Sequence, residues 1–280
     1  MSALTIASFE FRSRLKLVST WVYFLVFFCL SLLWIAAAGG LFKDANISFG
    51  SGKVAVNSPF ALAQTVAVLG MFGITVMAAI MGRAVQQDVE YRTQGFFFTA
   101  PIGKLEYLGG RFAGALGVLL VVFASLGLGA FVATLLPGMD AERLGPNRWA
   151  AYLLPYATVL VPNALLIGAV FFSLAAATRK MLPVYVGSVL VLIGWLIAVQ
   201  LVRDADNRTI AALVDPFGSR AVNTLTEYWT ISERDTRLVP LEGILLWNRL
   251  LWLGIAAILV CYAILCHHAK VWFNNKFGVD

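Results

Sequence analysis

The chain has 280 residues, of which 60% are hydrophobic and only 13% charged, and its mean hydropathy is +0.82. A soluble globular domain carries charges on about a quarter of its residues, so this composition excludes one and indicates a protein of the lipid bilayer. The net charge of +6 could point to nucleic acid, but the basic residues stand at the ends of apolar segments, which favours a membrane topology and no nucleic-acid partner.

The first segment, residues 1–19, predicts a helix that lies in the membrane interface. Its apolar residues recur at helical spacing, at Leu4, Ala7, Phe11, Leu15 and Val18. Such a stripe is typical of an interfacial amphipathic helix. The alternative is a cytoplasmic lead-in whose stripe has no function.

Six later segments are apolar over a length that can cross the bilayer, because about 20 helical residues of about 1.5 Å rise span its hydrocarbon layer. We predict these spans at residues 21–42, 59–82, 112–136, 152–177, 181–202 and 245–266. The expected fold is therefore an all-α membrane protein with one transmembrane domain over residues 1–280. Pro155 and Pro162 are expected to kink the fourth span.

The topology follows from the number of spans and the loop charges. An even number of spans places both termini on one side, and the segments on that side carry more Lys and Arg than Asp and Glu. By the positive-inside rule we expect both termini in the cytoplasm.

The cytoplasmic segment 83–111, between the second and third spans, is unusual for a water-facing loop. Its first half holds the charged residues Asp88, Glu90 and Arg92 and the adjacent phenylalanines Phe96, Phe97 and Phe98. Exposing three phenylalanines is costly, because burial of apolar surface is worth about 25 cal/mol per Å2. These three phenylalanines, which we call the Phe96–Phe98 knob, are therefore expected to pack into a partner's groove. The alternative is that they pack into lipid or into the chain's own bundle.

Small and neutral polar residues mark two further features of the spans. Gly110, Gly114 and Gly117 are spaced so that another backbone can approach the third span closely. Candidates to line a path through the membrane are Gln64, Thr65, Thr158 and Asn163. The alternative for both sets is packing and hydrogen bonding within the chain's own helices.

The external segment 203–244 looks folded. Asp215 followed by Pro216 predicts the start of a helix, and the charged residues from Glu233 to Arg237 predict a solvated face. No His-Glu-x-x-His and no G-x-x-x-x-G-K-[ST] motif is present. We therefore expect no metal site, no cofactor bound by this chain and no enzyme activity of the chain by itself.

The cytoplasmic segment carries a recognisable pattern: Asp88-x-Glu90-x-Arg92-Thr93-x-Gly95, then Pro101, then Glu106-Tyr107-Leu108-x-Gly110-Arg111. With an interfacial helix and six spans, this resembles the ABC-2-type transporter permeases. The resemblance implies that the first segment is an elbow helix and that the second-to-third loop holds a coupling helix, which docks in an ATPase subunit. That helix would comprise Gln94, Gly95, Phe96, Phe97, Phe98, Thr99 and Ala100.

A narrower resemblance runs along most of the chain. Its motifs are Asn57-Ser58-Pro59-Phe60, Asp206-Asn207-Arg208-Thr209, Asp215-Pro216-Phe217-Gly218, Tyr228-Trp229-Thr230 and Trp247-Asn248-Arg249-Leu250. These are similar to the membrane part of bacterial proteins that combine an ABC-2 permease with a zinc aminopeptidase (gluzincin) domain. Because the peptidase motif is absent, the resemblance implies transport without proteolysis.

The resemblance thus implies the permease subunit of an ATP-driven exporter in the bacterial inner membrane, moving a hydrophobic, amphipathic or peptidic substrate. Its partners would be ABC ATPase subunits, which hold ATP and Mg, and a second six-span permease unit, identical or homologous. An aminopeptidase domain or subunit would be a further partner. The alternative function is a non-transporting membrane anchor or assembly protein for a partner enzyme such as a peptidase.

Overall fold

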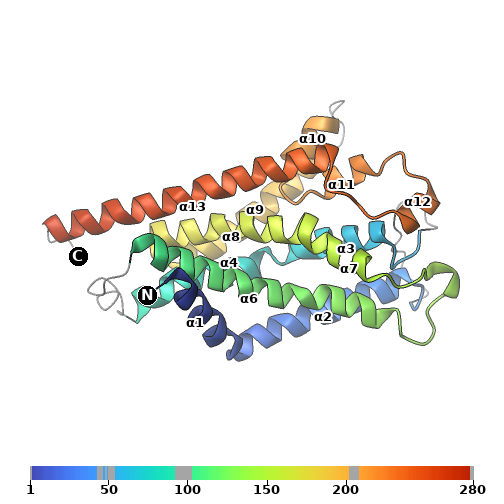
Figure 1. Cartoon of the computed structure of the whole chain (residues 1–280), viewed down its shortest axis with the longest axis horizontal. Helices are drawn as coiled ribbons and strands as arrows, with labels where there is room; N and C mark the ends of the chain where they lie inside the picture. The colour runs from blue at the N-terminus through green and yellow to red at the C-terminus, as the bar shows by residue number, and fades with distance from the viewer. Residues whose placement is uncertain are drawn as a thin grey trace.

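The computed structural model of the chain describes residues 2–42, 47, 49, 54–91, 103–201 and 208–277, and within these ranges it is helical and contains no strand. The long helices run side by side in one bundle. The N-terminal helix and the end of the last helix lie at the same end of this bundle (Figure 1). The predicted all-α fold is confirmed.

The structure contains long helices, which form the bundle, and short helices, several of which lie at the end of the bundle away from α1. In chain order they are α1 (Ala3–Leu15), α2 (Val18–Ala38), α3 (Pro59–Phe72), α4 (Ile74–Glu90), α6 (Lys104–Ala133), α7 (Trp149–Pro155), α8 (Val161–Thr178), α9 (Met181–Leu201), α10 (Arg208–Val214), α11 (Ser219–Leu225), α12 (Ile231–Thr236) and α13 (Gly243–Phe277). A 3-10 turn, Ala141–Arg143, precedes α7, and a π-helical segment, Tyr156–Leu160, joins α7 to α8.

Several of these helices fit a membrane protein. Among the residues that the structure describes, four segments are long and apolar enough to cross a bilayer: Val18–Ala38, Leu105–Ala133, Trp149–Thr178 and Gly243–Ile264. Helices α3 and α4 meet the same criterion together across a bend of 57° and give a fifth if they form one span. In α9 the apolar stretch Met181–Ile197 is shorter. The predicted six segments therefore correspond to four or five possible spans and one shorter apolar helix.

The bend between α3 and α4 occurs at Gly73. Helix α3 begins with Ser58, whose hydroxyl accepts a hydrogen bond from the Ala61 N–H at 3.1 Å, and with Pro59 at the first helical position, a favourable start for a helix. A Cβ atom at Gly73 would lie 2.3 Å from the Phe123 ring. The glycine thus leaves room for a phenylalanine of α6 inside the bend.

Helices α4 and α6 extend into the segment expected as a loop. Residues 83–90 continue α4, and residues 104–111 begin α6. A predicted span ends where the first charged residues appear. A helix can nevertheless continue through such residues when their buried charges pair with one another. Residues 92–102, which include Arg92 and the expected coupling helix 94–100, lie outside the described residues.

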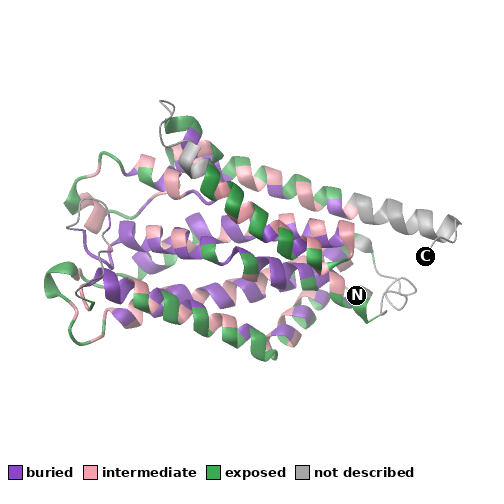
Figure 2. Ribbon diagram, turned by 180° about the vertical axis from the view of Figure 1, so that it is seen from behind, coloured by how far each residue is buried: buried purple, intermediate pink, exposed green. Residues whose placement is uncertain are grey.

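Burial separates central helices from peripheral ones. In the apolar stretch of Trp149–Thr178, 78% of the residues are buried, whereas the corresponding shares are 33% in Val18–Ala38 and 22% in Gly243–Ile264. Figure 2 shows the buried residues on the inward faces of the bundle and exposed residues on its outside. The exposed residues of α2 and α9 include large apolar side chains such as Trp21, Leu25, Leu182 and Leu190, which suits contact with lipid.

The fourth predicted span is irregular between its two prolines. The π-helical segment Tyr156–Leu160 lies between Pro155 and Pro162. Proline removes a backbone donor from a helix, and π-helical segments often occur at functional sites. The Tyr156 hydroxyl donates to the Phe123 carbonyl at 3.0 Å and accepts from the Gly127 N–H at 2.6 Å, which ties this segment to α6.

Candidate functional site

Buried charged side chains from α1, α4 and α6 meet at the end of the bundle where the chain begins. Arg111 donates to both Glu10 and Asp88, Arg14 donates to Glu10, and the Tyr107 hydroxyl donates to Asp88. The four charged residues are 1–6% exposed. We call these five residues the Glu10–Arg111 cluster.

The cluster holds because each buried charge has an opposite charge beside it. Isolated charges in an apolar interior are very costly, and pairing offsets that cost. Arg111 bridges the two carboxylates, and Arg14 also donates to the Ile80 carbonyl at 3.0 Å. Burial lowers the pKa of Arg14, and the neighbouring Glu10 carboxylate opposes that shift.

The glycines Gly110, Gly114 and Gly117 lie where α1 crosses α6. A Cβ atom at Gly110 would lie 2.8 Å from the Ala3 carbonyl oxygen, and one at Gly114 would lie 2.7 Å from that of Ala7. At Gly117 the added atom would meet the Phe11 ring at 3.0 Å. The backbone that approaches this face is therefore the chain's own first helix, which brings Glu10 and Arg14 to Arg111.

The predicted charged residues of the cytoplasmic segment separate into different environments. Asp88 is 5% exposed and belongs to the Glu10–Arg111 cluster, whereas Glu90 is exposed at the end of α4. Sequence analysis missed Glu10 and Arg14 as partners, because it treated α1 by its apolar stripe. The available signal was the spacing of Glu10 and Arg14 at i and i+4, which places them on one helix face together with Ile6.

The four candidate path-lining residues have different hydrogen-bonding environments. Gln64 donates to Asn223 at 2.7 Å, and Thr158 donates to the carbonyl of Leu154 at 3.1 Å. The Thr65 hydroxyl is buried with no hydrogen-bond partner. Three cavities among the described residues have none of the four in their lining.

Asn163 belongs to a second buried polar group, with Arg249 of α13. The Arg249 guanidinium, 2% exposed, donates to the Asn163 side-chain oxygen at 2.6 Å, and the Asn163 amide donates to the Phe217 carbonyl at 3.0 Å. Sequence analysis gave Arg249 no role. It is the only charged residue within the six predicted spans, and that was the signal.

Two of the sequence motifs meet beside this arginine. The Asn248 amide donates to the carbonyls of Ala212 and Asp215, both at 2.8 Å. The Asp215 carboxylate accepts from the backbone N–H groups of Phe217 and Arg220 at 3.0 and 2.8 Å. Helix α11 begins later than the Asp215-Pro216 pair predicts, after Gly218 with a φ of +74°.

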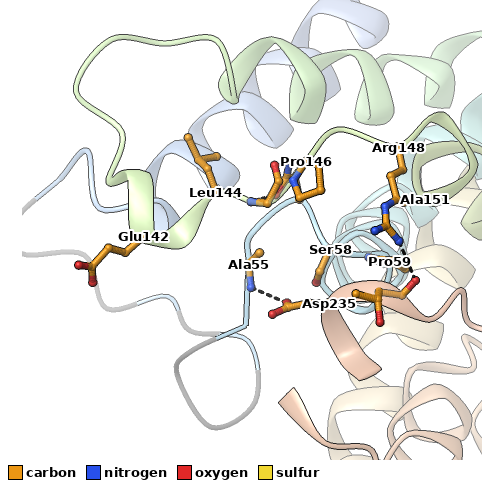
Figure 3. Close-up of a pocket in the computed structure, with 12 residues that line it drawn as sticks. Ala55, Ser58, Pro59, Glu142, Leu144, Pro146, Arg148, Ala151 and Asp235 are labelled. Atoms are coloured by element: carbon orange, nitrogen blue, oxygen red, sulfur yellow. Dashed lines mark hydrogen bonds between the residues drawn. The ribbon is translucent and has the colours of Figure 1, made fainter. Parts of the chain in front are cut away.

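A polar cavity of about 190 Å3 opens at the opposite end of the bundle from the Glu10–Arg111 cluster, between the start of α3, residues 142–148 and α12. Figure 3 shows Asp235 held by the Ala55 N–H, at 2.8 Å, and Arg148 bonded to the Thr236 carbonyl, at 3.1 Å. The Asn57 amide donates to the Gly145 carbonyl at 2.6 Å. These bonds join three segments distant in sequence into one wall.

The sequence matches no known family model and no curated protein. Among the residues that the structure describes, no group of three or more His, Cys, Asp or Glu side chains could hold a metal ion. The arrangement that stands out chemically is the Glu10–Arg111 cluster, whose groups hold three helices in fixed relation.

Proposed function

We propose that the chain is the membrane-spanning permease subunit of an ATP-driven exporter of the ABC-2 type. The observation that carries this proposal is the Glu10–Arg111 cluster. It joins α1 to α4 and α6, the two helices that residues 92–102 connect. A force on that connection reaches three helices together, because buried ion pairs of fixed geometry resist separation.

In this proposal the ATPase subunit binds residues 94–100 through the Phe96–Phe98 knob. ATP hydrolysis in the partner displaces that segment, and α4 and α6 move with it. The cluster then carries α1 along, so the elbow helix and two spans respond as one body. ATP and Mg remain in the partner subunit, and this chain contributes no catalytic group.

The proposed topology has α2, α3 with α4, α6, α7 with α8, α9 and α13 as six spans, α1 as the elbow helix, and both termini in the cytoplasm of a bacterial inner membrane. Both chain ends lie at one end of the bundle (Figure 1). Helix α1 leaves Leu4 and Phe9 81% and 66% exposed while it buries Glu10 and Arg14. That distribution suits a helix whose outer face meets lipid.

The substrate that this proposal favours is hydrophobic, amphipathic or peptidic, and a second six-span unit completes its path. Neutral polar groups at Gln64, Thr65 and Thr158 would offer hydrogen bonds along that path, and Asn163 would stand there together with the Arg249 guanidinium to which it is bonded. The exposed apolar faces of the outer helices give the second unit, or lipid, a surface to pack against.

The experiment is purification of the tagged chain from its native host in mild detergent, with mass spectrometry and an ATPase assay of the complex. We expect a stoichiometric ATPase subunit, lost in Phe97→Asp and retained in Phe97→Leu, since only the first change places a charge in the apolar knob. Equal recovery with both variants would overturn the docking at residues 94–100. Recovery of the wild-type chain with a peptidase and no ATPase would instead favour the membrane anchor.

A further inference from the structure

A small cavity lies at the end of the bundle where the chain begins, between the α1–α2 junction, α4, α6 and α9. Its volume is about 50 Å3. The lining residues are Arg14, Leu17, Ser19, Thr20, Tyr23, Ala79, Ile80, Arg83, Val118 and Tyr185. The cavity therefore combines two guanidinium groups with hydroxyl groups.

The hydrogen bonds of Arg14 leave one donor group unused. Its Nε faces Glu10 and its Nη1 donates to the Ile80 carbonyl, whereas its buried Nη2 has no hydrogen-bond partner. Arg14 is 5% exposed. A buried donor without an acceptor is costly, and Arg14 is one of the residues that line the cavity.

Positive charge exceeds negative charge around this donor. Arg83 lines the same cavity and forms no ion pair with any residue that the structure describes. The cluster together with Arg83 holds three guanidinium groups, Arg14, Arg83 and Arg111, against two carboxylates, Glu10 and Asp88, which leaves one positive charge in excess. An anion is the ligand that such a balance attracts.

Exposed apolar residues on two helices that contribute to the cavity indicate where the anion would come from. On α2, next to the lining residues, Val18 is 78% and Val22 50% exposed, and on α9 Leu182 is 73% and Val186 50% exposed. Apolar side chains in this position suit acyl chains. Basic pockets between membrane helices commonly bind anionic headgroups.

We propose that this cavity, formed by Arg14, Arg83, Ser19 and Tyr185, is a binding site for the phosphate group of an anionic amphiphile, with the headgroup of a membrane phospholipid as the favoured source. A cavity needs roughly 10–15 Å3 of volume measured in this way to hold one water, so about 50 Å3 accommodates a group of a few atoms such as a phosphate but no acyl chain. The chains lie outside, against α2 and α9. This site is independent of the transport function proposed above.

The test measures thermal unfolding of the purified, delipidated full chain in dodecyl maltoside with added phosphatidylglycerol, phosphatidylcholine or inorganic phosphate. We expect phosphatidylglycerol to raise the unfolding temperature more than phosphatidylcholine, because a ligand of the native state stabilises it. Arg83→Gln should weaken binding of phosphatidylglycerol about fivefold, the contribution of one arginine near an anionic headgroup.

The matched control is Arg12→Gln, which removes the same charge from an exposed position of α1 that does not line the cavity. This variant should bind phosphatidylglycerol like the wild type. If inorganic phosphate raises the unfolding temperature, phosphatidylglycerol does not, and the effect of phosphate is lost in Arg83→Gln, the pocket binds the free anion and not the lipid headgroup. The proposal fails if Arg83→Gln and Arg12→Gln bind phosphatidylglycerol equally, or if the two lipids protect the wild type equally.

Discussion

Glu10 and Arg111 are 101 residues apart in the sequence, yet their side chains form a buried ion pair in which Arg111 donates to the Glu10 carboxylate. The pair lies where three glycines of α6 admit α1, so close packing and charge pairing depend on each other. Close packing alone or charge pairing alone would hold α1 on α6 only weakly, because α1 buries only Ile6, Glu10 and Arg14. Two of the three residues that anchor the first helix are therefore charged.

Replacing Glu10 with alanine should strongly destabilise the protein. The change leaves the buried guanidinium groups of Arg14 and Arg111 without the carboxylate between them, and breaking a buried ion pair costs about 3–5 kcal/mol. Thermal unfolding in detergent measures the effect. Glu90→Ala, at an exposed position of α4, serves as the control and should shift stability by less than about 0.5 kcal/mol. Equal unfolding temperatures for the two variants would contradict the cluster.

Gly114→Ala should loosen the contact of α1 with α6. Its Cβ atom would lie 2.6 Å from the Glu10 Cβ and 2.7 Å from the Ala7 carbonyl oxygen, and overpacking of this kind costs about 1–3 kcal/mol. Gly109→Ala is the matched control on the same helix, because its Cβ meets nothing within 4 Å. That variant should be neutral or gain about 0.5–1 kcal/mol. Limited proteolysis measures the effect: cleavage within α1 should be faster than in the wild type for Gly114→Ala and unchanged for Gly109→Ala.

Asn163→Ala should be costly for a different reason. The variant removes the oxygen that accepts from the buried Arg249 guanidinium, and leaving a buried charged donor without its acceptor costs about 3 kcal/mol. Asn223→Ala removes an exposed amide that bonds to Gln64 and should cost less than about 0.5 kcal/mol. A chemical denaturation series on both proteins gives the comparison. If Asn163→Ala proves as mild as its control, Arg249 is held by something other than Asn163.

Helix α12 should lose its N-terminal cap in acid. The Glu233 pKa is lowered, first by the hydrogen bond from the Thr230 N–H and then by that from the Thr230 hydroxyl. A lowered folded-state pKa means that the cap stabilises α12 above the ordinary glutamate pKa, about 4.3, and is lost as the pH falls below it through the lowered value.

Hydrogen exchange of a peptide covering α12, corrected for the intrinsic pH dependence of exchange, checks this expectation. Protection should fall on acidification in the wild type. Thr230→Val lacks the hydroxyl and should begin to lose protection at a higher pH, because the pKa of Glu233 then returns toward its ordinary value. A pH profile identical in both proteins would show that the capping hydroxyl is irrelevant to α12.

The sequence predicts the helical architecture well because long apolar runs leave the backbone little choice in a bilayer. Helices α4 and α6 continue beyond the predicted span bounds at residues 82 and 112, and counting apolar residues cannot anticipate this because it does not tell a solvated charge from a paired one. The Glu10–Arg111 cluster depends on the crossing of α1 over α6, which is a tertiary property. The glycine spacing indicated a close approach there but did not identify the approaching helix.

The candidate path residues show the opposite limit of sequence reasoning. Thr65, Thr158 and Asn163 are buried polar residues within apolar segments, as their selection assumed, but only Asn163 bonds to a distant helix through its side chain. A polar residue in a span can satisfy its own backbone, and sequence alone cannot separate that from a residue facing a partner. Arg249, in contrast, could have been selected by charge alone.

The anchoring of α1 also sets an order of biosynthesis. The distant groups that hold Arg14 and Glu10 belong to Ile80 and Arg111, which leave the ribosome long after α1 itself. Until α4 and α6 are inserted, two charged side chains on the first helix have only each other and water. Helix α1 is therefore made before its distant partners and reaches its final contacts only after α4 and α6 are in place.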